Sequence, residues 1–536
     1  MRNQRIFRGW QFLLVVLLAS VGPLWGKAVD AQQQSITLSL ATEPPTLDST
    51  LATDQIGSFL LSHLMEGLTQ YGADGALAPG IAERWEVRAD GATFWLRSDA
   101  RWSDGKLVTA QDFVYAWQRA VKPETASQYA FILFPIKNAE AVNRGDMPEG
   151  ALGVEAAGAH RLEVRFEQPC PYFDKLTAFM TYYPVRRDVV EQWGRAYAAD
   201  ADKMMFNGPF VLSRWVHGAH LELIKNPRYW NADAISLQRI SMPYITTDPG
   251  THYNLFKDNR IALSPLDAST LQDAVGRGYE THLFEFGTLY FLEPNMRPGR
   301  PTQNLALRRA IQHVLKPSLL VHKVLGLPGI KPAYSLFPST MRAGSGVFSE
   351  QFPPPQVHYS LTKARAYMAQ AKRELGDIPP LTLLVGDSPR AVNEAEFYQY
   401  VLKQALGLET KLDQQTFKQR IAKMQQGDFD IAAAGWGPDF DDPITFGDLF
   451  ASWNENNRGR FSDSRYDGWV RTAQQSLDPD VRLEAFDQMQ HIINEQVVII
   501  PTYENVGLYV QHPKLIGVRR SIFGGDPNYR YARVLK

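Results

Sequence analysis

The sequence predicts mixed α/β lobes, because short strand patterns alternate with amphipathic helix patterns along its 536 residues. Residues 161–166 alternate between apolar and charged types, as in a strand with one buried face. Residues 307–315 place apolar side chains at helical spacing, and Pro317 is expected to end that helix. Residues 483–493 repeat this spacing after the start signal Asp478-Pro479. The length exceeds what one hydrophobic core supports, so two or three lobes are expected.

Further strands are predicted at residues 93–97 and 221–223, each after a glycine-containing turn. Asn207-Gly208-Pro209 interrupts a polar, helix-like stretch and precedes another strand. Residues 294–301 are rich in Pro, Gly and Arg, which indicates a crossing between lobes. Residues 327–355 contain many prolines and are typical of a packed, irregular loop.

The first 31 residues are typical of a signal peptide that is removed on export. Positive charges precede an apolar run at residues 12–19, and Val29-Asp30-Ala31 offers small residues for cleavage before Gln32. The positive region contains Arg2, Arg5 and Arg8. The alternative is an uncleaved anchor, but the run is shorter than the roughly 20 apolar residues of a membrane span. The mature chain is therefore expected to be soluble in the periplasm.

Composition narrows the possible partners. The formal net charge is −1 and no basic stripe is present, which argues against nucleic acid as a partner. Cys170 is the single cysteine, so no intrachain disulfide can form, and no cysteine lies near the cleavage site to carry a lipid. Between two prolines, Cys170 is expected to be a small buried hydrophobic residue.

Motifs for catalysis or metal binding are missing from the sequence. His217 and His220 are the closest histidine pair, but they flank a predicted turn without acidic or cysteine companions nearby in sequence. Asp439, Asp441 and Asp442 form a cluster, yet a calcium loop needs glycine at its sixth position, where Ile444 stands. We therefore expect neither a metal, nor another cofactor, nor enzymatic activity.

Residues 432–443 stand out by composition, with small residues, Trp436 and several carboxylates in one turn. The preceding residues 429–431 are typical of a strand, so this segment is a strand end that opens into a loop. Such loops bind ligands in open α/β sheets. A surface turn with solvated acidic groups explains the composition equally well.

Ordered motifs over the whole mature chain resemble the oligopeptide-binding proteins of bacterial ABC importers, the extracytoplasmic solute-binding family 5. The motifs that carry this resemblance are residues 41–48, 66–68, 77–85, 102–117, 207–210, 226–230 and 307–310, and the Trp436–Asp439 loop.

The resemblance implies a type II-like periplasmic binding protein, α/β in class, with two lobes joined by a hinge and an additional third domain. The first lobe is then expected to comprise residues 32–65, 205–287 and 505–536. Residues 66–204 would form the additional domain and residues 288–504 the second lobe. Closure of the hinge would bury a ligand between the lobes.

The same resemblance implies a receptor that encloses an extended peptide and delivers it to an inner-membrane ABC permease and its ATPase, as a monomer. Similar proteins bind murein peptides, nickel complexes or oligosaccharides, and these solutes are the alternatives. A chaperone-like role for unfolded segments is compatible with the same groove.

Five positions match ligand-binding positions of the family. Asp439 matches the aspartate that receives the α-amino group of the peptide, and a carboxylate in a closing cleft needs such a cation. Trp436 and Phe417 are expected to form aromatic walls, and Tyr129 matches a pocket tyrosine of the additional domain. Gly435 lies where the main chain would pair with an extended ligand.

Other positions depart from the family. Two arginines that hold the ligand's carboxylate in the best-known relatives align without gaps with Met424 and Ala433, so this anchor is missing. Arg420 or Lys423 is a candidate substitute. A disulfide pair of those relatives aligns with Thr288 and Gly437.

Overall fold

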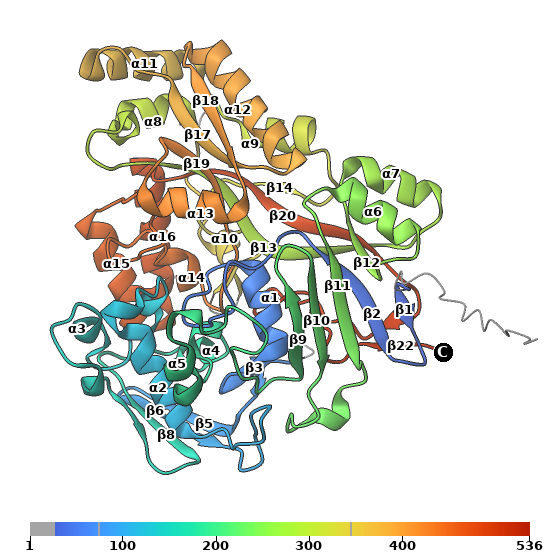
Figure 1. Ribbon diagram of the computed structural model, residues 1–536. Helices are drawn as coiled ribbons and strands as arrows, with labels where there is room; N and C mark the ends of the chain where they lie inside the picture. Colours follow the sequence, from blue (N-terminus) through green and yellow to red (C-terminus); the bar gives the residue numbers. More distant parts are fainter. Residues whose placement is uncertain (1–26, 73–74, 344–345, 358) are drawn as a thin grey trace, which may run out of the picture.

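The computed structural model describes residues 27–72, 75–343, 346–357 and 359–536. Its main sheets have five, seven and four strands, with helices between and around them (Figure 1). The predicted mixed α/β class is thus confirmed.

The five-stranded sheet combines the start of the described chain with strands some two hundred residues later. Its order is β1 (Val29–Asp30), β2 (Ser35–Leu40), β11 (Arg239–Ile245), β10 (His220–Lys225) and β9 (Phe210–Val216). Strands β2 and β11 run parallel, and the other neighbours run antiparallel. Leu221 and Leu223 are fully buried, as the predicted alternation requires.

The four-stranded sheet lies within residues 66–204, at the lower left of Figure 1. Its order is β5 (Ala82–Arg88), β6 (Gly91–Leu96), β8 (Arg161–Arg165) and β7 (Val154–Ala156). Helix α2 (Ala110–Val121) contacts β7 and β8. Leu162 and Val164 of β8 face the core, which confirms the predicted strand, although β8 ends at Arg165 rather than Phe166.

The seven-stranded sheet carries the remaining long strands. Its order is β12 (Leu263–Leu266), β20 (Ile500–Gln511), β13 (Thr281–Pro294), β19 (Ile431–Trp436), β17 (Leu381–Gly386) and β18 (Thr410–Gln415), and β14 (Lys331–Pro332) pairs with β20. The longer helices outside the other sheets are α6 (Pro249–Lys257), α7 (Ala268–Gly276), α8 (Leu305–Gln312), α11 (Leu361–Leu375), α12 (Pro389–Leu406), α13 (Phe417–Gln426), α15 (Ser464–Gln475) and α16 (Pro479–Gln496).

Strands β13 and β20 pair antiparallel and pass through both positions where a change of lobe is predicted, 287/288 and 504/505. Their register shifts between Glu285 and Leu289, and Gly287 has a φ of +65°. That conformation favours glycine because a Cβ would be strained. The domain boundaries themselves stay a prediction.

Helix α8 ends earlier than the sequence predicts. Leu307, Ala310 and Ile311 are buried on its inner face, but the helix stops at Gln312. Pro317 starts the next helical turn, and the preceding Lys316 is extended, as expected for a residue before proline. The predicted helix 307–315 therefore begins two residues too late and ends three residues too late.

The predicted signal peptide lies mostly outside the described residues, since Arg2, Arg5, Arg8 and the apolar run fall within residues 1–26. Ala28 is fully buried and β1 pairs with β2, so cleavage after Ala31 would remove one edge strand. The cleavage position stays a prediction. Within the described part of the chain, no helix combines the length and apolarity that a membrane crossing requires.

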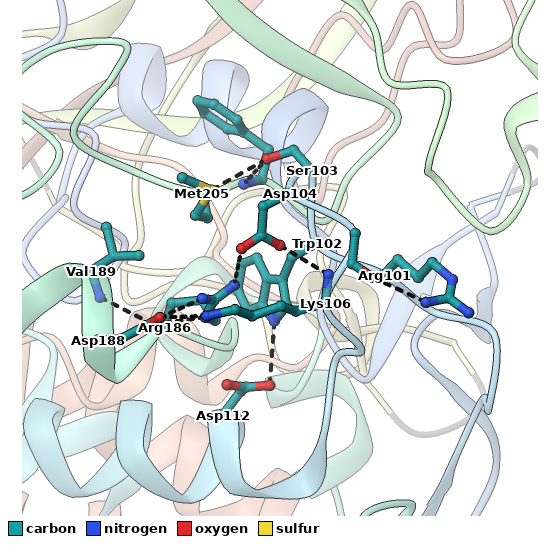
Figure 2. A network of polar contacts seen from close by, with 12 residues as sticks. Arg101, Trp102, Ser103, Asp104, Lys106, Asp112, Arg186, Asp188, Val189 and Met205 are labelled. Carbon is teal, nitrogen blue, oxygen red and sulfur yellow. Dashed lines mark hydrogen bonds and ion pairs between the residues drawn. The ribbon is translucent and has the colours of Figure 1, made fainter.

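Several motifs that carry the resemblance build the scaffold. Figure 2 shows one of them, in which Asp104 accepts a hydrogen bond from the buried Arg186 at 2.9 Å. Trp102 Nε1 donates to Asp112, whose carboxylate also accepts from the backbone of Thr109 and caps α2. These residues fix the start of a helix against the neighbouring loops.

A second motif network surrounds the buried carboxylate of Glu66. Arg530, near the C-terminus, donates to it at 3.0 Å, and Tyr229 and Trp230 donate at 2.8 and 2.6 Å. The backbone of Glu66 exchanges two hydrogen bonds with Asn207. Four segments that are distant in the sequence therefore meet at Glu66. The buried carboxylate of Glu66 is stable only with these hydrogen-bond donors in place.

We expect Arg530→Met to lower the free energy of unfolding by about 3 kcal/mol, the low end for breaking a buried ion pair, because Tyr229 and Trp230 still donate to Glu66. Urea titration followed by tryptophan fluorescence measures the change. The double variant with Glu66→Gln should regain part of the loss, since the uncompensated charge disappears. Arg144→Met, at an exposed ion pair, is the control. Equal effects of the buried and exposed changes would contradict the prediction.

Candidate functional site

Strand β19 presents a free edge beside the central cavity. Along its full length it pairs with β13, but its parallel pairing with β17 covers only Ile431 and Ala432. The following residues, including Gly435, therefore turn one backbone edge away from the sheet. Gly435 is exposed, and a Cβ there would lie 3.1 Å from the ring of Tyr290. Glycine therefore avoids a close contact with Tyr290, its partner on β13.

The loop after β19 is held by Thr445 at the start of α14 (Ile444–Gly447). Trp436 Nε1 donates to the Thr445 carbonyl at 2.9 Å, and the backbone amide of Asp439 donates to its hydroxyl at 2.9 Å. Trp436 is 8% exposed. Both side chains therefore have fixed positions.

Residues of the 66–204 segment clamp the same loop from outside. The backbone amide of Asp441 donates to the Tyr71 hydroxyl, and Lys175 donates to the Asp441 carbonyl at 2.6 Å. The rings of Tyr172 and Phe440 stack with centroids 5.8 Å apart. These contacts hold the loop that carries Asp439 against residues 66–204.

Tyr129 of the same segment reaches Asp439 directly. Its hydroxyl donates to both carboxylate oxygens, at 3.2 and 3.0 Å. Burial raises the pKa of Asp439 to about 8, and the Tyr129 hydrogen bond opposes this shift only in part. Burial also raises the pKa of Asp448, and the nearby Asp439 raises it further. No arginine, lysine or histidine among the described residues forms an ion pair with Asp439.

A cavity of about 600 Å³ lies beside this carboxylate, a size typical of ligand sites. All five predicted ligand residues line it, so the structure brings them together. They are Tyr129, Phe417, Gly435, Trp436 and Asp439. Other lining residues include Asp54, Met180, Tyr290, Asp387, Arg390, Glu394, Arg420, Met424, Arg458, Tyr503, Ile522 and Asp526.

Two positions at which the sequence departs from the family are found in the cavity wall. Met424 and Ala433 both line the cavity, and neither carries a charge. A Cβ on Gly437 would lie 3.1 Å from the Thr288 hydroxyl, so these two positions are neighbours. This proximity supports the register of the alignment across the loop.

Only one of the two candidate substitutes for the missing carboxylate anchor lines the cavity. Arg420 lines the cavity, whereas Lys423 is not among the lining residues. Lys423 instead pairs with Asp413 and with Asp428, the latter at 3.0 Å. Its charge is compensated on the outer side of α13.

Sequence reasoning missed several lining residues. Glu394 accepts from Arg390 Nε at 3.1 Å and from the Tyr503 hydroxyl at 2.9 Å, so these side chains form a closed network in the wall. Tyr503 stacks on Tyr290 with centroids 4.7 Å apart. Arg458 comes from a loop between Phe450 and Phe461. No local pattern marks any of these residues as facing a cavity.

His217 has no acidic companions nearby in sequence, but the fold brings Glu43 and Asp200 to its two ring nitrogens. Sequence neighbours could not show this. Asp442, grouped with Asp439 in the sequence, instead pairs with Arg482 at 2.6 Å. The described ranges contain no group of three or more His, Cys, Asp or Glu side chains that could hold a metal ion.

Comparison with known proteins gives one family. The model of bacterial extracellular solute-binding proteins, family 5, matches residues 76–458. The oligopeptide-binding protein OppA of Bacillus subtilis is 29% identical over 506 residues, which cover 92% of this chain and 91% of that protein. The probable deoxycholate-binding periplasmic protein YgiS of Escherichia coli is 30% identical over 539 residues, covering 98% of each chain.

Solved structures agree with this family. The substrate-binding domain of an oligopeptide ABC transporter from Bacillus anthracis superposes with a TM-score of 0.89 at 34% identity, covering 95% of this chain and all of that one. The predicted fold class is thereby confirmed: the chain has the α/β architecture of a periplasmic binding protein, with two lobes and a third domain.

The burial of Asp439 predicts a pH dependence of stability in the ligand-free protein. In the unfolded chain an aspartate titrates near pH ~3.9, whereas Asp439 holds its proton up to about pH 8 when folded. Stability from this group is therefore present at low pH and lost as the pH rises through about 8, by at most about 1.4 kcal/mol per pH unit. Asp439→Asn lacks this loss.

We expect Asp439→Asn to gain stability relative to the wild type between pH 5 and 8, measured by urea titration on protein refolded without ligand. Asp441→Asn, two residues away and outside the cavity lining, is the control and should follow the wild type. Parallel pH curves for Asp439→Asn and the wild type would contradict burial of an ionisable Asp439.

Proposed function

The chain belongs to the bacterial extracellular solute-binding proteins of family 5, and from this premise we propose that it is an extracytoplasmic receptor for peptides. It encloses an extended oligopeptide between its lobes and delivers it to the permease of an ABC transporter. The mature protein acts in the periplasm as a soluble monomer without a lipid anchor. The family and the named relatives are binding proteins rather than enzymes.

The observation that carries this proposal is the carboxylate of Asp439 in the wall of a large cavity, where it accepts from a tyrosine hydroxyl and pairs with no cation among the described residues. An ionised carboxylate is costly to bury unless a positive group accompanies it. The α-ammonium group of a peptide has the charge, size and three donors that this position needs. Its binding would return Asp439 to the ionised form.

The rest of the wall suits an extended peptide. The free edge of β19 at Gly435 offers main-chain donors and acceptors, and pairing with them does not depend on the ligand's sequence. Trp436, Phe417 and Tyr129 add aromatic surface for side chains of varied shape. A site for the amino end together with a free backbone edge can therefore bind peptides of many different sequences.

Other solutes make different demands. A murein peptide carries an amino end and fits the same anchor, whereas a neutral oligosaccharide or a nickel complex leaves Asp439 without an ammonium partner. Deoxycholate, named for the YgiS relative, has a carboxylate and no amine. Deoxycholate and a neutral oligosaccharide are therefore included in the binding test below.

We expect Asp439→Ala to weaken binding of a free-amine pentapeptide by about thirtyfold or more, because truncating one partner of a buried charge pair costs about 2–5 kcal/mol. The N-acetylated form of the same peptide should bind wild type and Asp439→Ala with similar, weak affinity. Isothermal titration calorimetry on refolded, ligand-free protein measures both.

Asp441→Ala is the matched control, since its carboxylate lies two residues away and is 46% exposed. It should bind both peptide forms like the wild type. Equal losses for free and acetylated peptides would remove Asp439 from the anchor role. Binding of deoxycholate or an oligosaccharide, with no peptide bound, would overturn the peptide assignment.

A further inference from the structure

The residues that precede Gln32 are built into the five-stranded sheet. Strand β1 lies at the edge of this sheet and pairs antiparallel with β2 (Figure 1). In this pairing Val29 lies opposite Ile36, and Asp30 lies opposite Ser35. Strand β1 is therefore part of the sheet, although the sequence assigns it to the segment that is removed on export.

Ala28 connects this edge strand to two other parts of the fold. It is 0% exposed. Its amide donates to the carbonyl of Asn259, just after α6, and its carbonyl accepts from the amide of Thr37, both at 2.9 Å. The Thr37 hydroxyl donates to the Lys27 carbonyl at 3.0 Å. Loss of residues 27–31 would take these partners away from backbone groups on two separate segments, and an unpaired backbone group inside a protein is costly.

The turn from β1 to β2 also depends on a residue that precedes Gln32. Asp30 Oδ1 accepts hydrogen bonds from the backbone amides of Gln32 and Gln33, both at 2.9 Å. Gln34 then has a φ of +46°, which is unfavourable for a residue other than glycine unless neighbouring contacts hold it. The Gln34 side chain exchanges two hydrogen bonds with the backbone of Val534, close to the end of the chain. Asp30 thus supports a turn that also holds the C-terminal segment.

Two patterns of small residues that suit signal cleavage conflict with these contacts. Cleavage after Val29-Asp30-Ala31 would remove β1 and the Asp30 carboxylate. Cleavage after Gly26-Lys27-Ala28 would remove the fully buried Ala28. Residues 20–26, which follow the apolar run of the signal, also contain small residues, and cleavage there leaves every contact described above in place.

We propose that the export signal is cut ahead of Lys27, within residues 20–26, and that residues 27–31 belong to the mature protein as an edge strand and the start of its turn. This site replaces the cleavage after Ala31 that the sequence predicts. The inference is independent of the proposed function, because none of these residues lines the cavity.

The first test identifies the mature N-terminus directly. The full precursor is exported into a bacterial periplasm with its own signal, and the purified protein is analysed by N-terminal sequencing and intact mass spectrometry. We expect a first residue between Val21 and Lys27. Any other first residue, Gln32 and Met1 included, overturns the proposal.

A pair of point variants tests the same inference without relying on sequencing. In the exported protein, Ala28→Asp should lower the melting temperature by about 2 °C or more, because it places a charge at a position with no exposed surface. Lys27→Gln changes the exposed neighbouring residue and should leave the melting temperature unchanged. If residues 27–31 were removed on export, both variants would yield the wild-type mature protein, and equal melting temperatures for all three would overturn the proposal.

Hydrogen–deuterium exchange tests the contribution of β1 to the sheet. Two chains are produced without a signal, one starting at Lys27 and one at Gln32. In the shorter chain the Thr37 amide should exchange about tenfold faster or more, because its acceptor on Ala28 is missing. Residues 161–165, in the four-stranded sheet, should exchange equally in both chains. Equal exchange at Thr37 would contradict the inference, whereas a shorter chain that fails to fold beside a folded longer one would support it.

Discussion

The carboxyl group of Asp439 lies in the wall of a large cavity, and the Tyr129 hydroxyl is the partner that the fold provides for it. A hydroxyl compensates a buried negative charge only in part, which is why burial raises the pKa of this carboxyl so far. The group is thus held by Thr445 in a place where its ionised form is unfavourable until a cation arrives. Ligand binding can supply the missing interaction, and this makes affinity depend on charge at one end of the ligand.

Arg420 and Arg458 line the same cavity, and each has a buried Nε atom without a hydrogen-bond partner among the described residues. The free edge of β19 and the aromatic side chains line the same cavity and, under the proposed function, would make contacts that do not depend on the ligand's sequence. Selectivity for the amino end of a ligand and tolerance for the rest of it would then come from separate features of the cavity.

Sequence periodicity correctly predicted individual strands and helices, whose formation depends on residues close together in the sequence. The alternation at residues 161–166 gave β8, and the Asp478-Pro479 signal gave the start of α16. The five expected ligand residues line one cavity, although their roles stay a prediction. What remained hidden depends on long-range placement: Glu43 lies beside His217 across more than 170 residues, and no pattern near Arg458 reveals that it faces the cavity. Arg420 and Lys423 are three residues apart on one helix, and only the packing of α13 against the sheet decides which faces inward.

The motifs that identify the family and the residues that line the cavity are largely different sets. Glu66, Asn207, Tyr229 and Trp230 belong to recognisable motifs, yet they join distant segments around one buried charge and do not line the cavity. Trp102, Asp104 and Asp112 similarly secure α2 (Figure 2). By contrast, the cavity wall includes Met424, Ala433, Arg420 and Arg458, none of which belongs to those motifs. A shared scaffold can therefore persist while charges in the cavity change, and the ligand must be inferred from the wall of this chain rather than from the family name.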